Sequence, residues 1–153
     1  MNIRPILEKD QIEIKRVYFD SIKSISEKIY TKEQKFNWAI QAWENPEFIK
    51  TIINGEGWII EENNLTLGFA IRYPMQKLSL LYVRGDKQRN GFGTILLKKI
   101  ENDAKKQGIR LLNTEASLIS YKLLLKNNWM IVSKEKILIN ESFFDRYKMK
   151  KKI

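Results

Sequence analysis

The stretch that decides the fold covers residues 78–100 and reads LSLLYVRGDKQRNGFGTILLKKI. It begins as an apolar run of strand length, passes through a basic turn with three glycines, and continues as an amphipathic helix. The start of such a helix has free backbone N–H groups and the positive end of the helix dipole. Gly91 and Gly93 lack side chains, so an anion can reach these amides, and Lys87 and Arg89 add positive charge. The stretch therefore predicts a pyrophosphate site.

The spacing of this turn excludes two common phosphate-binding motifs. A dinucleotide fingerprint needs G-x-G-x-x-G, but counting from Gly91 the last position is Leu96. A P-loop needs Lys and Ser or Thr directly after its final glycine, whereas Phe92 follows Gly91. What remains is Q-x-x-G-x-G over residues 88–93, with a plain strand–helix connector as the alternative interpretation.

The composition limits the chemistry that the chain can perform. Its 153 residues suggest one domain over residues 1–153. The chain has no Cys and no His, which excludes a covalent cysteine intermediate, a Ser-His-Asp triad, and thiolate or imidazole metal ligands. An enzyme built from this sequence must use carboxylates, Tyr, Ser, Lys, backbone amides or water, and we expect no metal.

The formal net charge of +10 favours anionic partners, such as nucleic acid, phosphorylated cofactors or acidic membrane surfaces. The alternative is that the lysines are only solvated surface, because they are spread along the chain. The basic run KMKKK at residues 148–152 is expected to be frayed. The start MNIRPILEKDQ becomes polar too early for a secretory signal, and no apolar run is long enough to span a membrane. We therefore expect a cytoplasmic protein without membrane association.

The first third of the chain has the signals of helices. Asp10, with Glu13 three residues later, resembles a capping box, and Thr31 is a second candidate cap. Pro46 suits the first turn of a further helix. After a strand over residues 3–7, helices are expected over residues 11–26, 32–43 and 46–53.

From Gly57 onward the pattern is mostly that of strands. The pair Asn63-Asn64 and the single Asn140 predict tight hairpin turns, Gly68 predicts a bulge, and Gly108 predicts a helix end. Strands are expected over residues 57–62, 65–73, 77–83, 109–116, 129–139 and 143–149, and helices over residues 91–107 and 117–128. This order predicts a mixed α/β fold with one sheet and helices on both faces.

Between the strand LLYV and the amphipathic helix, Q-x-x-G-x-G resembles motif A of the GCN5-related N-acetyltransferase (GNAT) superfamily. The likeness extends to the strand LGFA, the strand end TEAS, the helix before NNW, and the final hairpin. The segments YTKEQKFNWAI and FFDRYKMKK resemble a bacterial subgroup of acetyltransferases of the YafP type. The resemblance implies a GNAT fold with a single, mostly antiparallel sheet. It also implies acetyl-CoA as cosubstrate and direct acetyl transfer to an amine in a ternary complex.

The resemblance also implies which residues bind the cosubstrate. The strand edge at Leu81, Tyr82 and Val83 would pair with the pantetheine arm, and Ser117 falls where many members carry an Asn that reaches the same arm. The pyrophosphate would be held by the backbone of Gln88, Arg89, Asn90, Gly91, Phe92, Gly93 and Thr94. The residues implied for the ribose phosphate, with a plain surface role as the alternative, are Lys122 and Lys126.

The catalytic positions of the family are less well matched. Ser79 stands where many members have a carboxylate, and Leu123-Leu124 stands where the general-acid tyrosine is usual. Tyr121, one turn earlier on the helix, is the nearest substitute, with a packing role as the alternative. Glu115 is the best candidate base, acting directly or through water, and its alternative is a solvated strand end. Catalysis by proximity and bulk water is a further alternative.

We expect the acceptor pocket between the first two helices and the sheet, where Tyr30 and Trp38 are the candidate ligand contacts and core packing is the alternative. Phe36 and Trp43 belong to the same region. The positive charge favours an acceptor with a phosphate or carboxylate.

Two other functions and a homodimer are also compatible with the sequence. The mismatches at the catalytic positions leave open an acyl-CoA-binding module with little turnover. The charge leaves open a toxin-like enzyme that acetylates aminoacyl-tRNA, although no RNA-reading motif is visible. A homodimer formed through the C-terminal hairpin is compatible with the resemblance.

Overall fold

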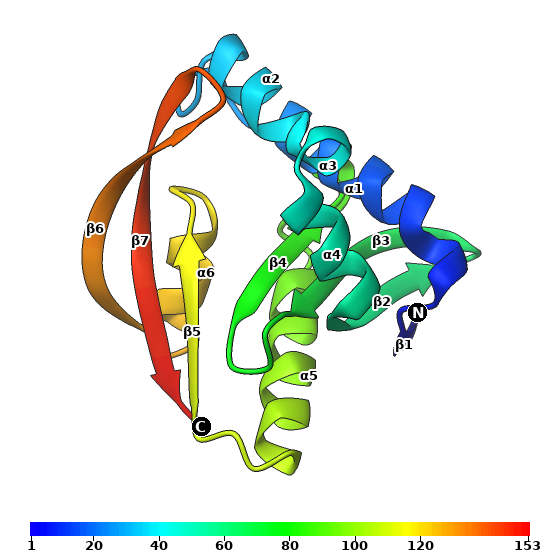
Figure 1. The fold of residues 1–153 in the computed structure, drawn as a ribbon. Helices are drawn as coiled ribbons and strands as arrows, with labels where there is room; N and C mark the ends of the chain where they lie inside the picture. The colour runs from blue at the N-terminus through cyan, green and yellow to red at the C-terminus, as the bar shows by residue number, and fades with distance from the viewer.

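The computed structural model describes all 153 residues, and its elements follow the predicted strand order (Figure 1). The strands are β1 (Asn2–Pro5), β2 (Glu56–Glu62), β3 (Leu65–Arg72), β4 (Leu78–Val83), β5 (Leu111–Ala116), β6 (Met130–Ile139) and β7 (Ser142–Lys152). The helices are α1 (Gln11–Lys23), α2 (Lys32–Ala39), α3 (Gln41–Glu44), α4 (Pro46–Asn54), α5 (Phe92–Lys106) and α6 (Ser120–Lys126). None of the helices is long and apolar enough to cross a membrane.

The caps of α2 and α4 follow the sequence signals. Thr31 accepts a hydrogen bond from the Gln34 backbone N–H at 3.1 Å, and the Gln34 side chain accepts one from the Thr31 N–H at 2.9 Å. Pro46 is the first residue of α4, after an Asn45 cap. The single helix expected over residues 32–43 is divided at Ile40 into α2 and α3.

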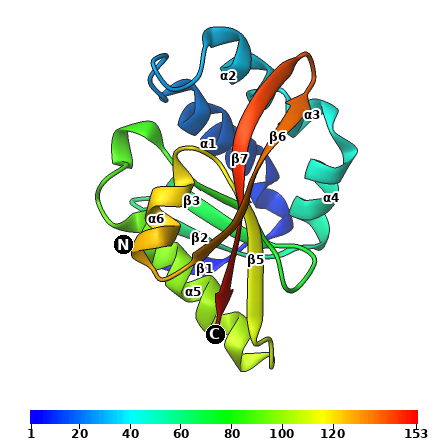
Figure 2. The ribbon, with the colours of Figure 1, turned by 90° about the vertical axis from the view of Figure 1, so that its left-hand side faces the viewer.

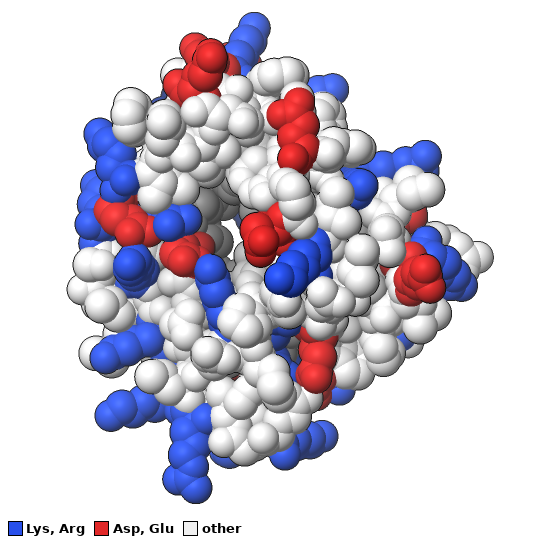
Figure 3. Space-filling model, viewed as in Figure 1, with Lys and Arg blue, Asp and Glu red and all other residues white.

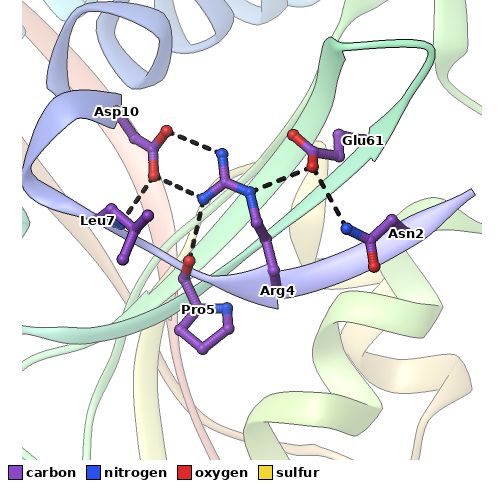
Figure 4. A network of polar contacts seen from close by, with 6 residues as sticks. All are labelled: Asn2, Arg4, Pro5, Leu7, Asp10 and Glu61. Carbon is purple, nitrogen blue, oxygen red and sulfur yellow. Dashed lines mark hydrogen bonds and ion pairs between the residues drawn. The ribbon is translucent and has the colours of Figure 1, made fainter.

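The predicted capping box of Asp10 and Glu13 is wrong, because the Asp10 carboxylate is bound elsewhere (Figure 4). Asp10 accepts two hydrogen bonds from the Arg4 guanidinium, at 2.8 and 2.9 Å, and one from the Leu7 N–H at 2.7 Å. Arg4 also donates to Glu61 of β2 at 3.2 Å. The guanidinium holds the pKa of Asp10 below its usual value, although burial acts in the opposite direction. The buried carboxylate thus joins the start of α1 to the sheet.

The strands form two sheets instead of one, with the orders β1-β2-β3-β4 and β5-β7-β6. All strand pairs within them are antiparallel, so the fold class is confirmed while the sheet is divided. The two halves meet at one parallel bridge between Lys77 and Asn113, supported by a hydrogen bond from Thr114 Oγ1 to the Leu78 carbonyl at 2.6 Å. Beyond the bridge no ladder holds β4 against β5, and the two strands diverge (Figure 1).

Two bulges shape the first sheet. Ile60 pairs with Gly68 and Glu61 with Thr66, so Leu67 is the extra residue of β3, and the bulge predicted at Gly68 is confirmed. A Cβ on Gly68 would lie 2.8 Å from the Tyr82 carbonyl, so the close approach of β3 and β4 needs glycine there. The second bulge lies in β4, where Ser79 is the extra residue, since Leu78 and Leu80 pair with consecutive residues of β3.

The core lies in two clusters, one on each face of the first sheet. Helix α5 covers one face with Leu96, Leu97 and Ile100, while α1 and α4 cover the other with Ile14, Val17 and Phe48 (Figure 2). The predicted turns are confirmed by the positive φ angles of Asn63 (50°), Asn64 (63°), Gly108 (84°) and Asn140 (52°).

The C-terminal segment is ordered, so the prediction of a frayed tail is wrong. Strand β7 continues to Lys152 and pairs there with β5. Lys151 Nζ lies 2.8 Å from Glu101 Oε1, and Trp129 Nε1 donates to the same oxygen at 2.9 Å. Lys151, which belongs to a run that looked solvated in the sequence, therefore holds the second sheet to α5.

Candidate active site

A cavity of about 1190 Å³ opens between the two sheets. It extends from the start of α5, along β4 and β5, to the loop between α1 and α2 and to the β6–β7 hairpin. Pockets for a single small ligand usually measure about 300–1000 Å³, so this cavity has room for a large ligand and a second, smaller one. Figure 3 shows a hollow on the side where β6 and β7 face the helices, with acidic and basic side chains around it.

The start of α5 presents free backbone donors to the cavity. Gly91 precedes the helix with a φ of 82°, and no side chain caps the helix. The N–H groups of Phe92, Gly93 and Thr94 therefore have no partner within the helix. A Cβ added to Gly91 would meet no atom within 4 Å, so the space in front of these amides is open. This geometry suits an anionic group such as a pyrophosphate.

Most of the predicted turn residues lie where the sequence placed them. The residues of the turn that line the cavity are Gln88, Arg89, Gly91, Phe92, Gly93 and Thr94. Asn90 is the exception: its side chain donates to the carbonyls of Lys87 and Gln88 at 3.0 and 3.2 Å and so braces the turn from outside. Lys87, Lys122 and Lys126 also line this end of the cavity, which makes it strongly cationic.

Strand β4 forms the long wall of the cavity. Leu81, Tyr82 and Val83 line it, and β4 is the last strand of its sheet, so one of its backbone edges faces the gap. Ser117 also lines the cavity, but its hydroxyl oxygen already accepts hydrogen bonds from the N–H groups of Ile119 and Ser120 at 3.2 and 3.0 Å. Ser117 therefore organises the start of α6.

Glu115 lines the cavity near the place where β4 and β5 meet. Its carboxylate forms an ion pair with Lys77 Nζ at 2.7 Å, which restrains its position. Ser79 lines the same region, and its hydroxyl donates to the Tyr73 carbonyl beside the β4 bulge. Leu124 is buried in the core and supplies no polar group. Glu115 is therefore the ionisable group on this part of the wall.

Tyr121 does not line the cavity, which corrects its expected place at the site. Its ring packs on that of Tyr147, with the centroids 4.6 Å apart and the planes tilted by 36°. It also lies against the core cluster under α5. The helical face that carries Tyr121 is directed toward β7, so the geometry supports the packing alternative.

The far end of the cavity is aromatic, and two of the residues expected there line it. Tyr30 and Trp38 form part of the wall, with ring centroids 5.3 Å apart, and the Tyr30 hydroxyl accepts a hydrogen bond from the Leu118 N–H at 2.9 Å. Phe36 and Trp43 do not line it, and their side chains are 62% and 49% exposed.

Among the cavity residues that the sequence did not indicate are Tyr18, Phe48, Phe144 and Asp145. Tyr18 and Phe48 have the spacing of core residues and are indeed buried, so no sequence signal separates them from the rest of the core.

Burial raises the pKa values of Tyr18, Tyr30 and Tyr82. The Tyr18 hydroxyl already donates its proton to the Trp38 carbonyl at 2.9 Å. No group of three or more carboxylates that could hold a metal ion is present.

A comparison with protein families gives the class of protein to which this fold and cavity belong. A family model described as an acetyltransferase (GNAT) domain matches residues 25–122, which is more than half of the chain. The chain therefore belongs to the GNAT acetyltransferases.

Individual solved structures share the fold. A GCN5-related N-acetyltransferase from Rhodopseudomonas palustris superposes with a TM-score of 0.93 at 23% identity, over 99% of this chain and 95% of that one. The PaiA N-acetyltransferase from Thermoplasma acidophilum, solved with coenzyme A, gives 0.78 at 17% identity, with both chains fully covered. The acetyltransferase YncA from Salmonella typhimurium, solved with acetyl-CoA, gives 0.69 at 16% identity, over 99% and 93% of the chains. No curated protein sequence matches the chain significantly.

Proposed function

We propose that this acetyltransferase uses acetyl-CoA and transfers the acetyl group directly to an amine while both substrates are bound. The observation that carries the proposal is a single continuous cavity. One end has the free amides of α5 and a set of cations, and the other end has aromatic side chains and carboxylates. Two ligands of different chemistry can therefore occupy it together, and coenzyme A in two proteins of the same fold supports the choice of cosubstrate.

Residues at successive positions along the cavity would have different roles in binding and catalysis. The α5 amides, Lys87 and Arg89 would bind the pyrophosphate, and the free edge of β4 would hydrogen-bond the pantetheine amides. The thioester end then lies toward Glu115, where the two sheets converge. In the reaction the amine nitrogen bonds to the acetyl carbon and the carbon–sulfur bond breaks. Glu115 would accept the amine proton, and the tyrosine hydroxyls or solvent would protonate the leaving thiolate.

Initial-rate kinetics test the ternary complex. Release of the CoA thiol can be followed with a thiol reagent, and the protein adds no background because it has no cysteine. Varying acetyl-CoA at several fixed amine concentrations should give intersecting reciprocal plots. Parallel plots would contradict direct transfer and indicate a covalent acetyl-enzyme.

A second candidate is an acyl-CoA-binding module with little turnover, which the Ser79 and Leu124 positions favour. The same assay separates the two, because a module would bind coenzyme A but release no thiol with any amine. The toxin-like activity on aminoacyl-tRNA stays a prediction, and binding of tRNA that weakens steeply with salt would support it.

Several finer predictions are part of the same proposal. The YafP-type subgroup rests on the two segments quoted above, and the single domain, the cytoplasmic location and the homodimer also stay predictions. Light scattering of the purified chain measures its oligomeric state, and cell fractionation measures its location.

A further inference from the structure

We infer that the acceptor is a cationic primary amine on an apolar, aromatic body, the class of the arylalkylamines. This inference rests on the proposed acetyltransferase function. It comes from three features of the acceptor half of the cavity: a continuous aromatic wall, an apolar mouth, and the distribution of charge.

The aromatic wall consists of rings that touch one after another. Phe48 packs edge-on against Tyr18 with centroids 4.6 Å apart, and Tyr18 packs against Tyr82 at 4.7 Å. Trp38 follows at 6.4 Å from Tyr82, and Phe144 lies 6.1 Å from Trp38. All of these side chains line the cavity. A wall of this kind binds a flat apolar body by dispersion and attracts a cation over the ring faces.

The mouth of this half is apolar as well. Ile29, in the loop before α2, and Leu138, at the end of β6, line the cavity although they are 44% and 58% exposed. Large apolar side chains that stay exposed at the rim of a cavity are typical of a binding site for an apolar group.

The charges do not fit an anionic acceptor, although the net charge of the chain favoured one. The cations Lys87, Arg89, Lys122 and Lys126 belong to the α5 end. In the acceptor half the only lining cation is Arg146, and Glu135 binds it.

The lining carboxylate at the mouth, by contrast, is weakly paired. Asp145 Oδ1 lies 3.9 Å from Lys136 Nζ, and both side chains are more than a third exposed. Asp145 is therefore available to attract an ammonium group. A phosphate or carboxylate on the acceptor would instead lie among aromatic faces beside this carboxylate without a free cation.

A panel of probes tests the inference. The probes are 2-phenylethylamine, phenylalanine (which adds a carboxylate to that amine) and spermidine (a cation without an aromatic body). We expect thiol release with 2-phenylethylamine at a kcat/KM about tenfold or more above the other two, the effect of roughly one lost contact. Faster release with phenylalanine or spermidine would overturn the inference and leave the proposed function intact. If no amine releases thiol, both are overturned.

A matched pair of variants links the preference to the wall. Leu138→Ser should raise the KM for 2-phenylethylamine about fivefold with kcat unchanged, because part of the apolar contact is lost. Val132→Ser is the control, since Val132 lies on the same strand with 56% exposure but does not line the cavity. Asp145→Asn should raise the KM for the amine and leave the KM for acetyl-CoA unchanged. Equal KM values for the Leu138 and Val132 variants would contradict an acceptor at this mouth.

Discussion

At the scale of single residues, the two carboxylates on the cavity wall have different surroundings. Glu115 is held by Lys77 at 2.7 Å near the junction of the sheets, whereas Asp145 lies 3.9 Å from Lys136 at the mouth. A general base needs a restrained position near the reacting atoms, and a recognition group needs access to solvent. Under the proposed function, this contrast favours Glu115 for proton transfer and Asp145 for amine recognition.

Replacement of Glu115 by Gln should lower kcat about 100-fold at neutral pH, because an amide cannot accept the amine proton. The loss should shrink at high pH, where more of the amine is already deprotonated. Glu141→Gln, at an exposed turn position, is the control. An unchanged kcat for Glu115→Gln would indicate that transfer depends on proximity and bulk water alone.

Asp10 should make stability sensitive to acid. Its pKa in the folded chain is below the usual 3.8, so its contribution is complete above that value and is lost as the pH falls through the folded-state pKa. Asp10→Asn should therefore lower the free energy of unfolding by about 2 kcal/mol at pH 7 and flatten its dependence on pH below 4. Urea titrations at several pH values measure both effects. Glu13→Gln, whose carboxylate pairs with the exposed Arg16 and lies 3.5 Å from Arg84, should change stability by less than about 1 kcal/mol.

At the scale of secondary-structure elements, α5 provides a matched pair of glycines. Gly91 before the helix and Gly108 after it have φ angles of 82° and 84°, and neither has an atom within 4 Å of an added Cβ. Gly91→Ala and Gly108→Ala should each cost about 1 kcal/mol, since both place a side chain in the left-handed region.

Only the Gly91 variant should also weaken coenzyme A binding, by about tenfold, because its methyl group enters the cavity beside the free amides. Calorimetric titration with coenzyme A measures the difference. Equal affinities in the two variants would argue against a pyrophosphate site at the start of α5.

The elements that the sequence predicted well depend on neighbours in the chain. The Thr31 cap, the Asn63-Asn64 turn and the Gly91 turn each arise within a few consecutive residues. The capping prediction at Asp10 was wrong because Arg4 of β1 binds the carboxylate more strongly than a helix amide would.

The acceptor half of the site was harder to predict for the same reason. Tyr18, Phe144 and Asp145 come from α1 and β7, which the fold brings together. Tyr121 and Leu124 lie one turn apart on α6, as expected, but Tyr121 packs on Tyr147 of β7, whereas Leu124 is buried at the cavity wall. The direction of a helical face is set by tertiary packing, and the spacing of residues alone does not reveal it.

At the scale of the whole molecule, the two sheets are joined at several places, two of which lie beside β5 and α5. One is the bridge between Lys77 and Asn113 beside the cavity. The other is Glu101 of α5, which binds Lys151 of β7 and Trp129 before β6. Helix α5 packs on the first sheet, so this second junction fixes the other sheet to it.

Lys151→Met should lower the free energy of unfolding by about 2–3 kcal/mol, because it leaves the buried Glu101 carboxylate without its cation. Lys150→Met, one residue earlier and exposed, should have an effect within about 0.5 kcal/mol. Chemical denaturation of the two variants measures the contrast. Similar values would mean that the C-terminal lysines are only solvated surface.

The unpaired edge of β4 has a consequence for isotope labelling. Neighbouring amides of this strand point in opposite directions, so every second one bonds to β3 while the others face the gap. In deuterated buffer the amides that face the gap should exchange faster than those bonded to β3, so deuterium should appear at alternate positions of the strand. A ligand bound along the gap would slow exchange only at the amides that face the gap. A single strand would thus report, amide by amide, how far along the sheet that ligand extends.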